Sequence, residues 1–250
     1  MACNFYMEYL DVADSTSRYA RDEAVRLWTE AAGKDFVAVV AEYQTAGRGQ
    51  RGNCWQSQRG ENLLLSIVAR PGSRLEVSRQ FLFSQAVALS LHSAMGRYGI
   101  DTRLKWPNDI YAGNRKLAGI LMELDFSGRF VEQAVIGIGL NVNQVNFPEM
   151  DRVPVSMRML LGSPFPVNEV MDRVLEAFEY YYGMMLADAN AVAAEYKELL
   201  LGIGEQRMFV DSSGCFVAVI EGVEPGGHLQ LRRSDGTLSR YAFKEVEMQL

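Results

Sequence analysis

The pattern of apolar residues along the first half of the chain predicts several short strands. Residues 36–42 and 62–69 are compact runs of β-branched and aliphatic residues, as expected for buried strands. Within residues 101–125, the turn-forming stretch AGNRK separates DIY from LAGILMEL, which predicts a hairpin. Residues 133–143 form a further apolar run, with glycines where a neighbouring backbone or a ligand must come close.

Apolar residues at helical spacing predict four helices, one before these strands, one between them and two after them. Residues 15–33 begin at a Ser/Thr capping signal and end at Gly33. Residues 79–99 predict a long, largely buried helix, and residues 168–201 predict two more. Because the strands and helices do not alternate as regular βαβ units, the pattern favours an α+β fold.

The last fifty residues differ from the rest of the chain. Short apolar strands are separated there by the turn sequences DSSG, EPGG and SDG, which predicts a meander of hairpins. We therefore expect residues 1–201 to form one domain and residues 202–250 a small β-barrel packed on it.

Composition narrows the function only a little. The chain has 250 residues, of which 48% are hydrophobic and 22% charged, as in ordinary globular proteins. A net charge of −6 argues against a broad nucleic-acid-binding face, so any anion site must be local. Three cysteines without a CxxC pair argue against a disulfide framework and favour the cytoplasm. We expect no signal peptide and no membrane span.

The first candidate for chemistry is the stretch QTAGRGQRGNCW at residues 44–55. It contains the closely spaced Gly47, Arg48, Gly49, Arg51 and Gly52, followed by Trp55. Glycines permit close backbone approach, and arginines present forked donors to phosphate or carboxylate. The stretch is typical of a loop around a phosphate-bearing ligand, although on its own a solvated turn explains it equally well. Its spacing does not match a P-loop.

A second cluster is KWPNDIY at residues 105–111. Asn108 and Asp109 follow Pro107, where their side chains can reach a ligand or a metal-bound water, and Lys105 adds a positive charge. An ordinary Asn-Asp turn is the alternative.

Two further clusters lie in predicted strands. In RKLAGILMEL at residues 115–124, simple alternation places Lys116 on one face with Ala118, Ile120 and Met122. Lys116 could neutralise a carboxylate and a phosphate, or could extend to solvent. GIGLNVN at residues 137–143 is weaker evidence, because its glycines also suit tight strand packing.

Taken together and in this order, these motifs resemble the biotin protein ligases. The likeness rests on DST at 14–16, QTAGRGQRGNCW at 44–55, KWPNDIY at 105–111, RKLAGILMEL at 115–124, GIGLNVN at 137–143 and YAFKEVEM at 241–248. The resemblance implies a mixed sheet flanked by helices, of the class II synthetase-like or lipoate-ligase-like type, with a small SH3-like β-barrel at the C-terminus. Since DST falls at residue 14, it implies a monofunctional ligase without a DNA-binding domain.

The resemblance also implies a reaction in two steps. Biotin and ATP, with Mg²⁺, give biotinyl-5′-AMP, and a lysine of a biotin carboxyl carrier domain then accepts the biotin. The implied catalytic residues are Lys116, Arg48 and Asp109, with Asp109 near the metal, through water. DNA and membranes are not expected partners, and the resemblance leaves monomer and homodimer both open.

The family pattern assigns the ligand contacts as follows. The implied biotin-binding residues are Ser15, Thr16, Gln44, Gly47, Arg48, Lys116, Gly119, Leu121 and Gly137. The implied adenylate-binding residues are Arg51, Trp55, Asn108, Lys116 and Asn141. A plain helix cap is the alternative role for Ser15 and Thr16.

Three other functions are alternatives to biotin ligation. A lipoate ligase or octanoyltransferase shares the fold and the attack on a carrier lysine, but KWPND and the GRGxRGxxW pattern favour biotin. A non-catalytic biotin or nucleotide sensor does not need Arg48, Asp109 and Lys116 together. An RNA-binding protein would need a wider basic face.

Many relatives carry additional cations in the loop, where this chain has Gln50 and Asn53. Because fewer cations hold the adenylate less firmly, we expect Gln50→Arg to slow the dissociation of biotinyl-5′-AMP. Measuring adenylate release from the wild type and the variant checks this. Unchanged or faster release from the variant would contradict it.

Overall fold

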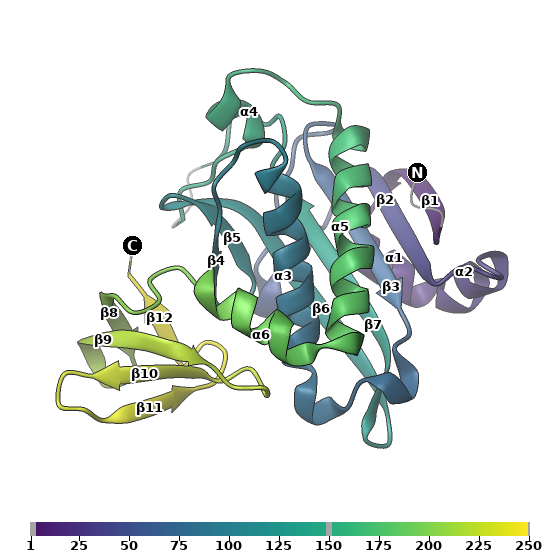
Figure 1. Ribbon diagram of the computed structural model, residues 1–250. Coiled ribbons are helices and arrows are strands. Elements are labelled where there is room, and N and C mark those ends of the chain that lie inside the picture. The colour runs from purple at the N-terminus through teal and green to yellow at the C-terminus, as the bar shows by residue number, and fades with distance from the viewer. Residues whose placement is uncertain (1–3, 149–151, 250) are drawn as a thin grey trace.

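A computed structural model describes residues 4–148 and 152–249, except for the side chain of Arg51. The main sheet has seven strands in the order β1-β2-β3-β7-β6-β5-β4 (Figure 1). These strands are β1 (Phe5–Ala13), β2 (Phe36–Gln44), β3 (Leu63–Ala69), β4 (Arg103–Lys105), β5 (Asp109–Ala112), β6 (Arg115–Ser127) and β7 (Phe130–Leu140). Strands β1 and β2 are parallel and the other neighbours antiparallel, which confirms a mixed sheet in an α+β fold.

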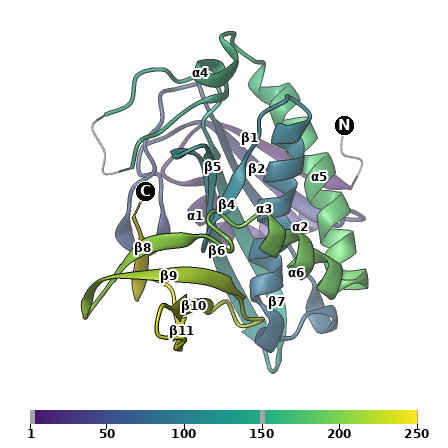
Figure 2. The same cartoon turned by 60° about the vertical axis from the view of Figure 1, so that its left-hand side comes forward.

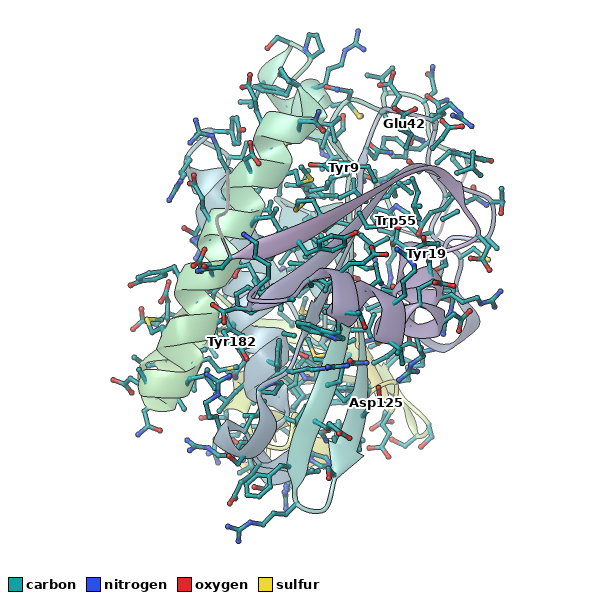
Figure 3. The ribbon with its side chains drawn as sticks, turned by 90° about the vertical axis from the view of Figure 1, so that its right-hand side faces the viewer. Tyr9, Tyr19, Glu42, Trp55, Asp125 and Tyr182 are labelled. Atoms are coloured by element: carbon teal, nitrogen blue, oxygen red, sulfur yellow. The ribbon has the colours of Figure 1, made fainter. Side chains whose placement is uncertain are left out.

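Helices cover the two faces of this sheet. The helices are α1 (Thr16–Asp22), α2 (Ala24–Glu30), α3 (Phe81–Gly96), α4 (Met157–Leu161), α5 (Val167–Ala187) and α6 (Ala189–Glu198). Helices α3, α5 and α6 pack together on one face, and α1 packs against β2, β3 and β7 on the other (Figures 1 and 3). In Figure 3, Tyr182 of α5 marks the first face, and Tyr19 and Trp55 lie on the side of α1.

The alternation of side chains along each buried strand explains the two layers. In β2, Phe36 and Ala38 belong to the large core beneath α3 and α5, whereas Val37 and Val39 belong to a smaller core beneath α1 and α2. Because both faces are covered, the strand is apolar at nearly every position, which is why the sequence shows it as a continuous run.

Three short turns of 3₁₀ helix complete the first half of the chain. They are η1 (Gln50–Gly52), η2 (Gly72–Arg74) and η3 (Val77–Arg79).

Two local predictions differ from the structure. Residues 15–33 form two short helices rather than one, with the break at Glu23. Strand β1 is not among the predicted elements: it lies at the sheet edge, so only some of its residues are buried and its pattern is weak.

The C-terminal residues form a second, antiparallel sheet in the order β11-β10-β9-β8-β12 (Figure 2). Its strands are β8 (Gln206–Asp211), β9 (Gly214–Val223), β10 (Leu229–Arg233), β11 (Leu238–Tyr241) and β12 (Val246–Met248). The meander is confirmed, but no pairing between β11 and β12 appears among the described residues, so closure into a barrel is not shown.

This small sheet packs directly on the main body. Phe209 and Leu231 belong to the same apolar cluster as the core beneath α3. Trp106 Nε1 donates a hydrogen bond of 3.0 Å to the carbonyl of Gly227, which ties the turn after β4 to the second sheet. The domain boundary at residues 201 and 202 stays a prediction.

No described helix combines the length and apolar character that crossing a membrane requires. Cys54 and Cys215 are exposed free thiols, and Cys3 lies outside the described residues.

An aromatic cluster joins α5 to the sheet, and it offers a test of the fold. Phe36 is 3% exposed and its ring lies 5.3 Å from Phe178 and 5.0 Å from Tyr182. We expect Phe36→Ala to lower the free energy of unfolding by about 3–5 kcal/mol, because it leaves a cavity between sheet and helix. Urea denaturation measures the change.

The control is Val25→Ala in α2, where the side chain is 83% exposed. That variant should change the free energy of unfolding by less than about 0.5 kcal/mol. Equal effects of the two substitutions would show that the cluster does not hold α5 in place.

Candidate functional site

Two rows of register partners form the floor of a cleft on the face of the main sheet opposite α3. One row runs across four strands through Lys105, Asp109, Gly119 and Gly139. The parallel row, two residues further along, runs through Leu121, Gly137 and Ser66. Since residues two apart in a strand face the same way, both rows face one cavity of about 890 Å³, which all of these residues except the fully buried Ser66 line.

The position of Lys116 corrects the prediction from simple alternation. The pairing of β5 with β6 shifts register between Ile110 and Tyr111, so Lys116 pairs with Tyr111 while Ala118 pairs with Ile110. Such a bulge moves the following residue to the other face. Ala118 and Ile120 therefore pack in the core, whereas Lys116 lines the cavity with Gly119 and Leu121.

Glycines in the floor leave room for the ring of Trp55. A Cβ added at Gly139 would lie 2.4 Å from Trp55 Cε2, and one at Gly119 would lie 3.1 Å from Trp55 Cζ3. The ammonium of Lys116 lies 5.7 Å from the centre of the same ring. Trp55 Nε1 is buried and has no hydrogen-bond partner among the described residues, so this edge of the cavity has an unused donor.

The Gly/Arg stretch folds back on itself above this floor. The amide of Trp55 donates to the carbonyl of Gly47 at 2.9 Å, and the amide of Gly49 donates to the carbonyl of Asn53 at 2.7 Å. A Cβ at Gly47 would lie 2.3 Å from the carbonyl oxygen of Trp55, so only glycine permits this close pairing. Gly47 thus serves the shape of the loop, and it is absent from the cavity lining.

The arginines of the stretch are placed differently. Arg48 lines the cavity, and its guanidinium donates to Glu123 Oε1 at 2.8 Å. Arg21 lies 3.7 Å from the same carboxylate oxygen. Arg48 is therefore paired with a carboxylate of β6 in this structure. The side chain of Arg51 is outside the part of the chain that the structure describes.

One end of the cavity is charged. The carboxylate of Asp109 is 4% exposed; its Oδ1 lies 2.7 Å from Lys116 Nζ and its Oδ2 lies 2.9 Å from Arg152 Nη1. The contact with Lys116 is an ion pair without hydrogen-bond alignment. Arg152 also reaches Glu247 of β12 at 3.3 Å. Arg152 escaped sequence reasoning because it stands 43 residues from Asp109, outside any motif.

This charged end does not form a protein cage for a metal. No group of three or more His, Cys, Asp or Glu side chains suited to a metal occurs within residues 4–148 and 152–249. Both oxygens of Asp109 face cations, so this carboxylate alone offers little to a bare ion.

The opposite end of the cavity carries neutral hydroxyl and amide groups. Ser66 Oγ donates to Thr16 Oγ1 at 2.8 Å and lies 3.0 Å from Ser17 Oγ. The amide and the hydroxyl of Thr16 both donate to Gln44 Oε1, at 2.8 and 3.1 Å. Ser15, 2% exposed, lines the cavity and makes no side-chain cap on α1.

Ser17 and Ser66 are site residues that the sequence analysis missed. A signal was present for Ser66, which is the single polar residue in the buried strand LLLSIVA. A polar side chain in such a run needs a partner, and here the partners line the cavity.

The two asparagines expected to hold the nucleotide are engaged with backbone groups. Asn108 lines the cavity, and its Nδ2 donates to the carbonyl of Ile120 at 2.6 Å. Asn141 is 3% exposed and does not line the cavity; its Nδ2 donates to the carbonyl of Val155 at 3.1 Å. Because Val155 pairs with the backbone of Lys116, Asn141 supports strand β6 at Lys116.

Known proteins resemble the chain along nearly its whole length. It is 31% identical over 241 residues to the bifunctional ligase/repressor BirA of Bacillus subtilis, covering 95% of this chain and 72% of the relative. It is 32% identical to the biotin–[acetyl-CoA-carboxylase] ligase of Paracoccus denitrificans, covering 86% of this chain and 90% of the relative.

Solved structures show the same fold. The biotin protein ligase of Aquifex aeolicus, in complex with biotin and ATP, matches with a TM-score of 0.79 and 24% identity, covering 99% of both chains. A model of the biotin/lipoate A/B protein ligase family matches residues 9–141, which contain the cavity floor and the Gly/Arg stretch. By these measures, the chain belongs to the biotin/lipoate A/B protein ligase family.

Proposed function

We propose that this chain is a biotin protein ligase, which activates biotin with ATP and transfers it to a lysine of a biotin carboxyl carrier domain. The observation that carries the proposal is the arrangement of one cavity: a neutral hydroxyl end, a glycine floor, and Lys116 at the charged end. The named activities of relatives at 31–32% identity support the same conclusion.

The neutral end suits the head group of biotin. Ser15, Thr16 and Gln44 offer both donors and acceptors, as a ureido group requires; Ser15 and Thr16 are buried and Gln44 is half-buried. Gly119, Gly137 and Leu121 line the cavity between this end and Lys116, where an aliphatic tail would lie. The tail would thus carry the carboxylate to the lysine.

In the first step, an oxygen of the biotin carboxylate attacks the α-phosphorus of ATP. The bond from the α-phosphorus to the bridging oxygen breaks, and pyrophosphate leaves with that oxygen. Both reactants are anions, so a cation between them lowers their repulsion and stabilises the charge on the phosphate. Lys116 is the cation that lies between the carboxylate and the α-phosphate. Arg48 adds a second cation once its guanidinium exchanges Glu123 for the adenylate.

In the second step, the neutral amine of the carrier lysine attacks the carbonyl carbon of the mixed anhydride. The bond from this carbon to the phosphate oxygen breaks, AMP leaves, and the amine loses a proton. The intermediate hydrolyses in water, so it must be covered while it waits. Trp55 and the folded Gly/Arg stretch, with Gln50 and Asn53, lie along the cavity and would cover it.

Mg²⁺ belongs to this proposal as the ion that screens the polyphosphate. Phosphate oxygens and water would supply most of its ligands, because Asp109 is held by Lys116 and Arg152. The choice between a monomer and a homodimer is left to measurement of the mass in solution.

Removing the charge of Lys116 tests the function. We expect Lys116→Ala to lower the rate of biotin transfer to a carrier domain by at least about 100-fold, since it removes the cation at the reacting atoms. Lys34→Ala is the control, because Lys34 is exposed and outside the cavity lining. Incorporation of labelled biotin is measured, with lipoate and octanoate as competing acids.

Two outcomes would contradict the proposal. Transfer of lipoate or octanoate in preference to biotin would assign the chain to another branch of its family. Full activity of Lys116→Ala would remove Lys116 from the reaction.

The neutral end is tested at Gly137. A Cβ there would lie 2.5 Å from Ser17 Oγ, so alanine must displace the hydroxyl pair of Ser17 and Ser66. We expect Gly137→Ala to raise the KM for biotin by about tenfold or more while the KM for ATP stays within about twofold. Steady-state kinetics of pyrophosphate release measure both constants.

Gly183→Ala in α5 is the matched control, because no atom lies within 4 Å of the added Cβ. A rise in the KM for ATP alone would place biotin elsewhere in the cavity.

A further inference from the structure

Lys105 is a buried cation that the steps above do not use. It ends β4, is 8% exposed, and lines the cavity. Its register partner across the hairpin is Asp109, so its side chain belongs to the row that forms the cavity floor. A lysine is seldom buried to this extent without a partner of opposite charge.

The carboxylates near Lys105 are committed to other cations. Asp109 is held by Lys116 and Arg152, and Glu247 is also held by Arg152. Among the described residues, no carboxylate lies within ion-pair distance of Lys105; its ammonium lies 5.4 Å from the centre of the Tyr111 ring. Burial lowers the pKa of Lys105 and Arg152 lowers it further, while Asp109 and Glu247 act in the opposite direction.

These neighbours place three cations at one end of the cavity, Lys105, Lys116 and Arg152, against the two carboxylates Asp109 and Glu247. This group of side chains therefore has one more positive charge than negative charge, and a bound anion would balance it. The backbone of β4 lies two strands, or about 10 Å, from that of β6, which carries Lys116 and would meet the carboxylate of biotin. The missing anion therefore lies beyond Lys116, away from the hydroxyl end.

We propose that Lys105 binds the β- and γ-phosphates of ATP and retains them as they leave as pyrophosphate. The inference rests on the proposed function, in which Lys116 holds the α-phosphate. A polyphosphate extends from Lys116 toward Arg152 and Lys105 and supplies the anion that these cations lack. Lys105 thereby stabilises the negative charge that accumulates on the leaving group.

Lys105→Met tests this, since methionine retains much of the apolar stem and removes the charge. Biotin-dependent exchange of labelled pyrophosphate into ATP gives the KM for ATP and the KM for pyrophosphate. We expect both constants to rise by about tenfold or more, the usual effect of losing a charge-assisted hydrogen bond. The KM for biotin, and transfer to a carrier domain from preformed biotinyl-5′-AMP, should stay within about twofold.

Lys34→Met is the matched control, and the melting temperature verifies that Lys105→Met is folded. Because the substitution removes a buried charge, the melting temperature should not fall. A phosphate KM within twofold of the wild type, or an equal loss in transfer from the preformed adenylate, would overturn the proposal. Absence of any biotin-dependent exchange in the wild type would instead reject the proposed function itself.

Chemical labelling of the wild-type protein tests the same proposal without a variant that has to fold. Cyanate carbamylates neutral amines, and burial, which lowers the pKa of Lys105, favours the neutral form with which cyanate reacts. Pyrophosphate should protect Lys105 and leave Lys34 unprotected, as read by peptide mass spectrometry. Equal labelling of Lys105 with and without pyrophosphate would also overturn the proposal.

Discussion

The buried carboxylate of Asp109 holds together the charged end of the cleft. A carboxylate that is only 4% exposed is costly to bury without cations beside it, and here Lys116 from the neighbouring strand and Arg152 from a distant part of the chain lie against it. Lys105, Lys116 and Arg152 together outnumber the two carboxylates Asp109 and Glu247, so this end of the cleft has an excess of cations. The protein thus keeps cations in place for anionic substrates, and Asp109 offsets the cost of burying them.

The same carboxylate links the two sheets. Arg152 contacts Asp109 on β5 and Glu247 on β12, so the charged end of the cavity is completed by a strand of the second sheet. The hydrogen bond from Trp106 to Gly227 fixes the turn beside Asp109 to the same sheet. These contacts give the C-terminal residues a direct part in shaping the cleft.

Sequence reasoning succeeded where a pattern was local. The apolar runs of β2, β3 and β7 and the long helix α3 were predicted because burial on both sides leaves a continuous signal. The candidate residues Ser15, Gln44, Trp55, Asp109 and Lys116 do line one cavity. The face of Lys116 was predicted wrongly, since the bulge that shifts it depends on pairing with Tyr111 and not on its own strand.

Residues that act through distant contacts could not be predicted. Arg152 and Glu123 matter because of partners 43 and 75 residues away, and no periodicity reports such a pairing. Asn141 resembled a ligand contact because it is a polar residue at the end of an apolar run, yet backbone carbonyls satisfy its amide. The sequence shows that a buried polar side chain needs a hydrogen-bond partner, but it does not show whether that partner is a ligand or the protein backbone.

The pairing of Arg48 with Glu123 makes the Gly/Arg stretch sensitive to ionic strength. Arg48 is 38% exposed and Glu123 is 17% exposed, so dissolved salt screens their attraction. The backbone pairing between Gly47 and Trp55 carries no net charge and is not screened in this way. Added salt therefore weakens the hold of Glu123 on Arg48 without weakening the backbone pairing of the loop, so the position of this guanidinium depends on the salt concentration as well as on the fold.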